Sequence, residues 1–140
     1  SNRARDFAER LGSPLAIVEK RRVTHQSSPQ TLNVIGEVEG KTAVLFDDEI
    51  DSGSSTVNAA TALRERGTKA VYAVCTHGVL SPGSTERILD SDIRELVVTD
   101  SIPVFQPELD GRLTVLSVAQ LFGEAIHRIH NGLSVGSMFE

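Results

Sequence analysis

The residues with the clearest capacity for chemistry lie between positions 47 and 56. Two adjacent aspartates, Asp47 and Asp48, follow a short apolar run, and another aspartate, Asp51, precedes a stretch of small residues rich in hydroxyls. That stretch consists of Ser52, Gly53, Ser54, Ser55 and Thr56. Carboxylates this close repel one another unless something shares their charge. The vicinal hydroxyls of a sugar, or a Mg2+ ion bridged to them, would do so.

The hydroxyl-rich stretch suits a phosphate group. A helix that starts near Ser54 offers unpaired backbone N–H groups and the positive end of its dipole, and both attract an anion. Gly53 lets the backbone approach a ligand closely, and the neighbouring hydroxyls add hydrogen-bond donors. Together with the acids, the stretch predicts a ligand with a phosphate at one end and a diol at the other.

A plainer interpretation is that the acids are solvated turn residues and that the serines only cap a helix, because both residue types favour these places. The order of acids, spacer, acid, hydroxyls and small residues between a buried strand and a helix favours the binding function. It is not a Walker P-loop, since no Gly-Lys-Ser/Thr follows the glycine.

A parallel α/β domain would position this stretch correctly. Residues 42–46 are predicted to form a strand buried on both faces, 47–53 a loop, 54–66 a helix that Gly67 ends, and 69–76 the next buried strand. In open parallel sheets, ligands bind beyond the carboxyl ends of the strands, where this loop would lie.

The rest of the chain continues the alternation of helices and strands. The long polar stretch 20–31 is predicted to be a mobile loop. Further helices are expected over 3–11 and 84–89, and strands over 14–18, 32–38, 95–99 and 113–116. A last helix is predicted from an apolar stripe of Leu121, Phe122, Ala125, Ile126 and Ile129.

The bulk composition argues against several classes of protein. The 140 residues carry a net charge of -5, which disfavours nucleic-acid binding because that depends on basic patches. No apolar run approaches the roughly 20 residues that span a bilayer, and no signal peptide is apparent, so we expect a cytoplasmic protein without a membrane partner. The single cysteine, Cys75, lies in an apolar run and is expected to be buried without a chemical role.

The stretch 47–55 resembles the motif that binds phosphoribosyl pyrophosphate (PRPP) in type I phosphoribosyltransferases and in ribose-phosphate pyrophosphokinases, the PRPP synthetases. Other segments resemble the C-terminal domain of the synthetases, from one end of the chain to the other. They include Arg3–Ala8, Lys20–Arg22, Asn33–Gly36, Thr76–Val79, Glu86–Ile88, Val97–Thr99, Ser101–Pro103, Glu124–Ile126 and His130–Phe139.

The resemblance implies a phosphoribosyltransferase-like, Rossmann-like fold and a transferase of nucleotide biosynthesis. Such an enzyme moves the diphosphoryl group of ATP onto the anomeric hydroxyl of ribose 5-phosphate, using Mg2+ and giving PRPP and AMP. It implies that Asp47 and Asp48 hold the ribose hydroxyls, directly or through metal, that Ser52 to Ser55 cradle the 5-phosphate, and that Asp51 shapes the loop. Lys20 and Arg22 match basic residues of the family's catalytic loop, which neutralise charge during phosphoryl transfer. By itself, so short a basic run would be an ordinary solvated surface.

The resemblance covers only about the second half of such an enzyme. We therefore expect one domain, residues 1–140, with the family's N-terminal domain absent, since a doubly wound domain usually opens with a strand and this chain opens with a helix. Because the family holds ATP largely through that domain, this chain alone is expected to bind a sugar phosphate at most. A homo-oligomer is also implied, since members of the family assemble as hexamers built from dimers.

Two alternatives stay open. The first is a phosphoribosyltransferase that consumes PRPP, although no region for recognising a base is apparent. The second is a non-catalytic regulatory subunit of the synthetase type. Glu49 and Ser54 favour this second alternative, because the family usually has an apolar residue and a glycine there.

Overall fold

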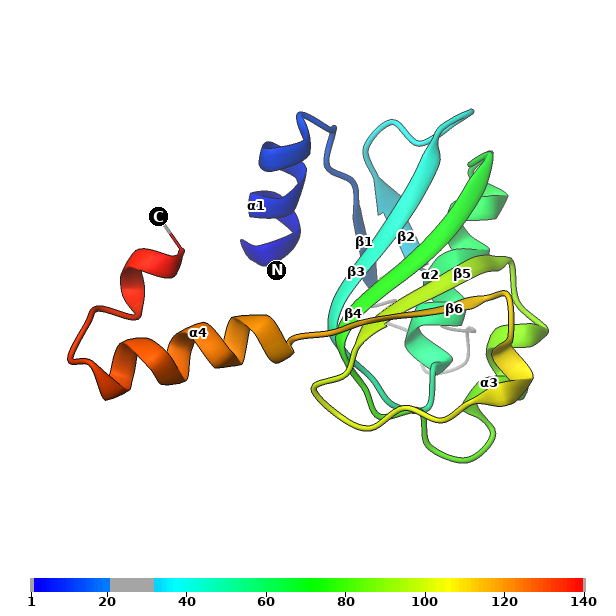
Figure 1. Cartoon of the computed structure of the whole chain (residues 1–140). Coiled ribbons are helices and arrows are strands. Elements are labelled where there is room, and N and C mark those ends of the chain that lie inside the picture. The colour runs from blue at the N-terminus through cyan, green and yellow to red at the C-terminus, as the bar shows by residue number, and fades with distance from the viewer. Residues whose placement is uncertain (1, 21–31, 140) are drawn as a thin grey trace.

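The computed structural model describes residues 2–20 and 32–139 of the chain. Its central element is a four-stranded parallel sheet (Figure 1). The strands are hydrogen-bonded in the order β3 (Thr42–Ile50), β4 (Ala70–Gly78), β5 (Ile93–Thr99) and β6 (Leu113–Leu116). The helices are α1 (Asn2–Leu11), α2 (Ser54–Glu65), α3 (Ser84–Leu89) and α4 (Ala119–His130), with short 3-10 turns at Pro107–Leu109 and Gly136–Met138. Parallel strands that alternate with helices confirm the predicted α/β class.

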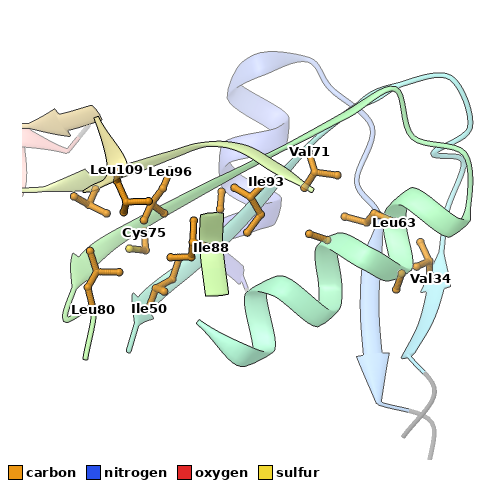
Figure 2. Packing of buried hydrophobic residues seen from close by; sticks show 14 of the residues in the cluster. Val34, Ile50, Leu63, Val71, Cys75, Leu80, Ile88, Ile93, Leu96 and Leu109 are labelled. Atoms are coloured by element: carbon orange, nitrogen blue, oxygen red, sulfur yellow. The ribbon is translucent and has the colours of Figure 1, made fainter. Parts of the chain in front are cut away.

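The hydrophobic core lies between one face of this sheet and the helices α2 and α3 (Figure 2). Successive side chains of a strand point to opposite faces, and in β4 the alternate residues Val71, Ala73 and Cys75 are all at most 2% exposed. They belong to one cluster with Leu63 of α2 and Ile88 of α3. This packing fixes α2, and with it the loop that precedes the helix.

Helix α2 ends as the sequence predicts. Gly67 adopts a φ of +83°, a left-handed conformation that favours glycine and stops a helix. The N–H of Thr68 donates to the carbonyl of Leu63 at 3.3 Å and that of Gly67 to the carbonyl of Arg64 at 2.9 Å, so these two carbonyls of the last turn are paired. The chain then enters β4 directly.

Strand β3 differs from the prediction in its length. The loop was expected to begin at Asp47, but the strand continues through Asp47 and Asp48 to Ile50. The extension forms because β4 also runs further than predicted, and the register pairs Asp47 with Cys75 and Ile50 with Gly78. Backbone hydrogen bonding between the two strands therefore overrides the turn preference of the acids.

The expected burial of β3 on both faces is wrong. Val44 is 49% exposed, whereas Ala43 and Leu45 pack against the core. The strand lies at the edge of the four-stranded sheet, and the face opposite the core meets α1 through Phe7, whose ring centroid lies 4.9 Å from that of Phe46. One short helix leaves much of this face open.

The two strands before β3 form a separate antiparallel pair, β1 (Ile17–Lys20) and β2 (Leu32–Ile35). β1 begins later and β2 ends earlier than the predicted strands. β2 ends at Gly36, which has a φ of +119° and lies so close to Ala16 that an added Cβ would come within 3.2 Å of it. Apart from Lys20, the predicted loop over 20–31 lies outside the described residues.

The last helix, α4, forms where it was predicted but leads away from the sheet (Figure 1). None of its residues is buried. Four residues of the predicted apolar stripe, Leu121, Phe122, Ile126 and Ile129, are 46% to 68% exposed. Within the described ranges, no helix is long and apolar enough to cross a membrane.

Candidate functional site

The acids and the hydroxyl-rich stretch lie at the carboxyl end of β3, where the chain passes into α2. Near the end of the strand, Asp47, Asp48 and Glu49 are exposed. Ile50, the last residue of the strand, is 2% exposed and anchors the strand end in the core. Residues 51–53 then connect the strand directly to α2. The short connection keeps the acids and the start of the helix close together in the chain and in space.

Gly53 sets the direction in which α2 begins. It precedes the first helical residue with a φ of +74°, and its carbonyl accepts the N–H of Val57 at 2.9 Å. A helix leaves its first N–H groups without intrahelical partners. Among the described residues, the N–H groups of Ser55 and Thr56 have no protein acceptor. They are therefore available to an anion at the positive end of the helix dipole.

The serine hydroxyls of the loop contact one another. The hydroxyl of Ser52 donates to Oγ of Ser54 at 3.2 Å and accepts the N–H of Ser54 at 3.4 Å. Both bonds are long, which makes them weak, so a phosphate could replace them at little cost. Ser55 is exposed beside them.

A metal would need oxygen ligands from outside the protein. The described residues contain no group of three or more His, Cys, Asp or Glu that could hold an ion. Asp47 and Asp48 are nevertheless adjacent, exposed carboxylates, and one or two carboxylates together with substrate oxygens and water suit Mg2+. The donor set therefore fits a Mg2+ ion shared with a bound sugar phosphate.

A cavity of about 840 Å³ opens beside the loop, between α1, β3 and α2. Its lining includes Asp47, Ser54, Ser55 and Thr56 together with apolar residues such as Phe7. Asp48, Asp51, Ser52 and Gly53 do not line it. The predicted binding residues thus follow one another through the end of β3, the connection and the first turn of α2, and only part of them line this cavity.

The structure describes only one of the two predicted catalytic residues. Lys20 is the last residue of β1, and Arg22 lies outside the described residues. Whether this basic pair meets the loop therefore stays a prediction.

Sequence reasoning missed one residue that contacts the loop. Arg87, on α3, donates a hydrogen bond from its guanidinium to the backbone carbonyl of Ser52. Thirty-five positions separate the two residues, and no local pattern links them. His77 lies near the end of β4. It is in register with Glu49, and its Nδ1 lies 2.9 Å from Oγ of Ser101.

Comparisons with known proteins identify a family for this chain. Residues 18–140 match the family described as the phosphoribosyl synthetase-associated domain. A ribose-phosphate pyrophosphokinase of Oceanobacillus iheyensis is 49% identical over 99% of this chain and 43% of its own length. One of Thermosipho africanus is 50% identical over 98% of this chain and 42% of its own length.

A solved structure is also similar. The crystal structure of phosphoribosylpyrophosphate synthetase from Mycobacterium smegmatis aligns with a TM-score of 0.82 and 37% identity. The alignment covers 94% of this chain and 43% of that chain. The chain thus has the fold of a synthetase segment and spans less than half the length of the relatives it matches.

Proposed function

Because the chain belongs to the phosphoribosyl synthetase-associated domain family, we propose that it supplies the ribose 5-phosphate site of a ribose-phosphate pyrophosphokinase. The observation that carries the proposal is the placement of the exposed acids Asp47 and Asp48 near the end of β3, which only residues 51–53 separate from a helix in which the N–H groups of Ser55 and Thr56 are unpaired. A ligand with a diol at one end and a phosphate at the other matches that placement. Ribose 5-phosphate and its product PRPP are both such ligands.

In the proposed reaction, the anomeric oxygen of ribose 5-phosphate bonds to the β-phosphorus of ATP. The bond from that phosphorus to the oxygen bridging the α- and β-phosphates breaks, and AMP leaves with the bridging oxygen. Asp47 and Asp48 would orient the ribose by accepting hydrogen bonds from its hydroxyls, which positions the anomeric oxygen for attack. Bound Mg2+ would neutralise part of the charge on the transferred group.

The phosphate end of the ligand would rest on the start of α2. The N–H groups of Ser55 and Thr56 and the hydroxyls of Ser52 and Ser54 would donate to the 5-phosphate, while Asp51 shapes the loop. Lys20 and Arg22 would approach the transferred diphosphoryl group and stabilise the charge that develops on it.

Isothermal titration of the chain with ribose 5-phosphate, with and without Mg2+, tests the proposal. We expect binding that the double change Asp47→Ala, Asp48→Ala abolishes. The matched control is Glu65→Ala, Asp90→Ala, which removes the same two charges at the far ends of α2 and α3 and should leave binding intact. Binding that survives the loss of Asp47 and Asp48, or no binding by the unaltered chain, would refute the assignment of the site.

The chain alone is not expected to catalyse the formation of PRPP and AMP. It spans less than half the length of its relatives, and the family resemblance implies that ATP is held largely by the part of those enzymes that it does not match. A coupled assay for AMP, with ribose 5-phosphate, ATP and Mg2+, should give no signal above background. AMP formation by this chain would contradict the expectation.

A non-catalytic regulatory subunit is the alternative that one observation favours. Ser54 stands at the first helical position, where its side chain contacts Ser52 instead of leaving the space open. If the loop has lost its ligand, Ser54→Gly would not create or tighten binding of ribose 5-phosphate. If the site is functional, the same change should leave binding intact or tighten it. The names of the relatives favour a synthetase origin over a phosphoribosyltransferase that consumes PRPP.

We also propose that the protein is a cytoplasmic homo-oligomer. Support for association comes from the exposed apolar stripe of α4, because contiguous apolar surface on a soluble protein often marks a contact with another chain. Location in the cytoplasm stays a prediction from the sequence, as does the assignment of residues 1–140 to one domain.

A further inference from the structure

Three consecutive carbonyl groups of the proposed binding loop are held from one side. The carbonyl of Ile50 accepts the N–H of Leu80 at 3.1 Å, and that of Asp51 accepts the N–H of Ser81 at 3.3 Å. The carbonyl of Ser52 accepts a hydrogen bond from the guanidinium of Arg87. All three donors belong to residues 80–87, which we call the brace.

These bonds decide which way the intervening N–H groups point. In a trans peptide, the carbonyl of one residue and the N–H of the next point in opposite directions. The described residues contain no cis peptide bond. With the carbonyls of residues 50–52 turned toward the brace, the N–H groups of Asp51, Ser52 and Gly53 therefore point away from it. Successive N–H groups that share a direction form a concave site for an anion.

The brace itself is firmly placed. Leu80 is 5% exposed and has a φ of +48°, a conformation that costs energy for a residue with a branched side chain and must be held by its surroundings. The side-chain amide of Gln106 contacts the carbonyl of Leu80 at 3.5 Å, and Oε1 of Gln106 accepts the hydroxyl of Thr85 at 2.6 Å. Ile88 of α3 is 1% exposed, and its side chain lies in the core next to Gly53.

Only the third of the three bonds depends on a particular side chain. It also holds the peptide most able to turn over, because Gly53 follows Ser52 and tolerates φ on either side of zero. If the peptide between Ser52 and Gly53 flipped, its carbonyl oxygen would face the ligand and repel a phosphate. A charged donor on that oxygen opposes the flip.

We infer that Arg87 is a positioning residue of the anion site, acting through the carbonyl of Ser52 and not by contact with the reacting atoms. This inference rests on the proposed function, since it assigns Arg87 a role in the binding of the 5-phosphate. It also makes a prediction about the protein without ligand, namely that the loop changes conformation when the guanidinium is removed.

The test uses the full 140-residue chain and three variants. Arg87→Met removes the guanidinium and keeps most of the side-chain length, and Arg87→Lys keeps a single charged donor. Arg94→Met removes an exposed arginine near the start of β5, at the opposite end of the sheet. Urea unfolding first establishes that each variant folds. Backbone amide NMR then compares the free proteins, and titration with inorganic phosphate and with ribose 5-phosphate measures binding.

We expect Arg87→Met to shift the amide signals of Gly53 and Ser54 in the free protein and to weaken binding of both ligands roughly tenfold, the effect of losing one charged hydrogen bond. Arg87→Lys should recover part of both effects, and Arg94→Met should show neither. Unchanged amide signals in Arg87→Met would overturn the inference even if affinity falls, because Arg87 would then act by contacting the ligand. Failure of the unaltered chain to bind either ligand would refute the proposed function, and the amide comparison would still decide whether Arg87 positions the loop.

Discussion

The backbone N–H of Asp48 donates a hydrogen bond to Oδ1 of Asp47 at 2.8 Å. One oxygen of the first acid is thereby oriented by the next residue, before any ligand arrives. Asp47→Asn keeps an oxygen that can accept this bond but removes the charge that a metal needs. We expect titration to show that Mg2+-dependent binding of ribose 5-phosphate weakens at least tenfold, while binding of inorganic phosphate without Mg2+ persists.

The exposed acid Asp110 provides the control for this experiment. Asp110→Asn changes the net charge equally and should leave both titrations unaltered. If Asp47→Asn bound ribose 5-phosphate with Mg2+ as tightly as the unaltered chain, Asp47 would have no part in holding the metal or the ribose.

Gly53 should be sensitive to substitution because of its backbone conformation and not because of crowding. A Cβ at this position would meet Ile88 at 3.6 Å, an ordinary contact, but the φ of +74° is costly for residues other than glycine. Gly53→Ala is expected to lower the free energy of unfolding by about 1–2 kcal/mol in urea. Gly53→Asn should cost less, since asparagine tolerates this conformation better.

Gly40 offers a matched comparison, with a φ of +69° and nothing within 4 Å of an added Cβ. Gly40→Ala should destabilise the protein by a similar amount without affecting ligand binding, whereas Gly53→Ala should affect both. Equal binding by the two variants would show that the conformation of Gly53 does not matter to the site.

The sequence predicted the elements around the site well because each carries its own local signal. Patterns of a few neighbouring residues predict the small-residue loop and the apolar positions of α2. The same kind of local signal predicts the end of α2 at Gly67, as the structure has it. The end of β3 could not be read in this way. Its acids favour a turn locally, and the pairing of this strand end with β4, such as Asp47 with Cys75 and Ile50 with Gly78, keeps them in the sheet.

Tertiary contacts account for the other differences. The contact between Arg87 and the carbonyl of Ser52 depends on how α3 packs against the loop, which one sequence does not encode in any periodic pattern. The apolar stripe of α4 correctly predicted a helix, but an amphipathic pattern cannot say what the apolar face meets. Ile126 and Ile129 prove to be exposed in this chain.

Cys75 should be unreactive in the folded protein. Burial raises the pKa of its thiol to about 11, an effect that a hydrogen bond with the backbone of Ile50 opposes and the charges of Asp47 and Glu49 reinforce. Because the thiolate is the reactive form, iodoacetamide at pH 8 should modify the native protein far more slowly than the protein unfolded in urea. Equal rates would show that the thiol is accessible.

The same shift predicts how stability depends on alkaline pH. The folded pKa lies above the ordinary value of 9.0, so the unfolded chain releases its proton first. The contribution of the thiol to stability is complete below pH 9 and is lost as pH rises toward about 11. In urea unfolding, the free energy of unfolding should fall less between pH 9 and 11 for Cys75→Ala than for the unaltered chain. The part of the fall that other groups cause should remain.

Asp100 should make the start of α4 sensitive to acid. Its Oδ1 accepts the N–H of Val118 at 2.7 Å, and this bond, with a smaller contribution from the hydroxyl of Ser117, lowers the pKa of the carboxyl. A lowered folded pKa means that stabilisation is present above the unfolded value of 3.8 and is lost as pH falls through the folded value. Asp100→Asn keeps an acceptor oxygen, so amide exchange at Val118 should stay slow in acid in this variant and quicken in the unaltered chain. The same acid response in both proteins would contradict this role of Asp100.

The apolar stripe of α4 should govern association of the chain. Ile126 and Ile129 are 67% and 68% exposed, so replacing either should change the free energy of unfolding by no more than about 0.5 kcal/mol. If copies associate through this face, Ile126→Glu, Ile129→Glu should lower the mass measured by light scattering, because burying two carboxylates at an apolar contact is costly. His127→Glu, His130→Glu places the same charges on exposed polar positions of α4 and should leave the mass nearly unchanged. Equal masses for the unaltered chain and the isoleucine variant would show that this stripe does not hold copies together.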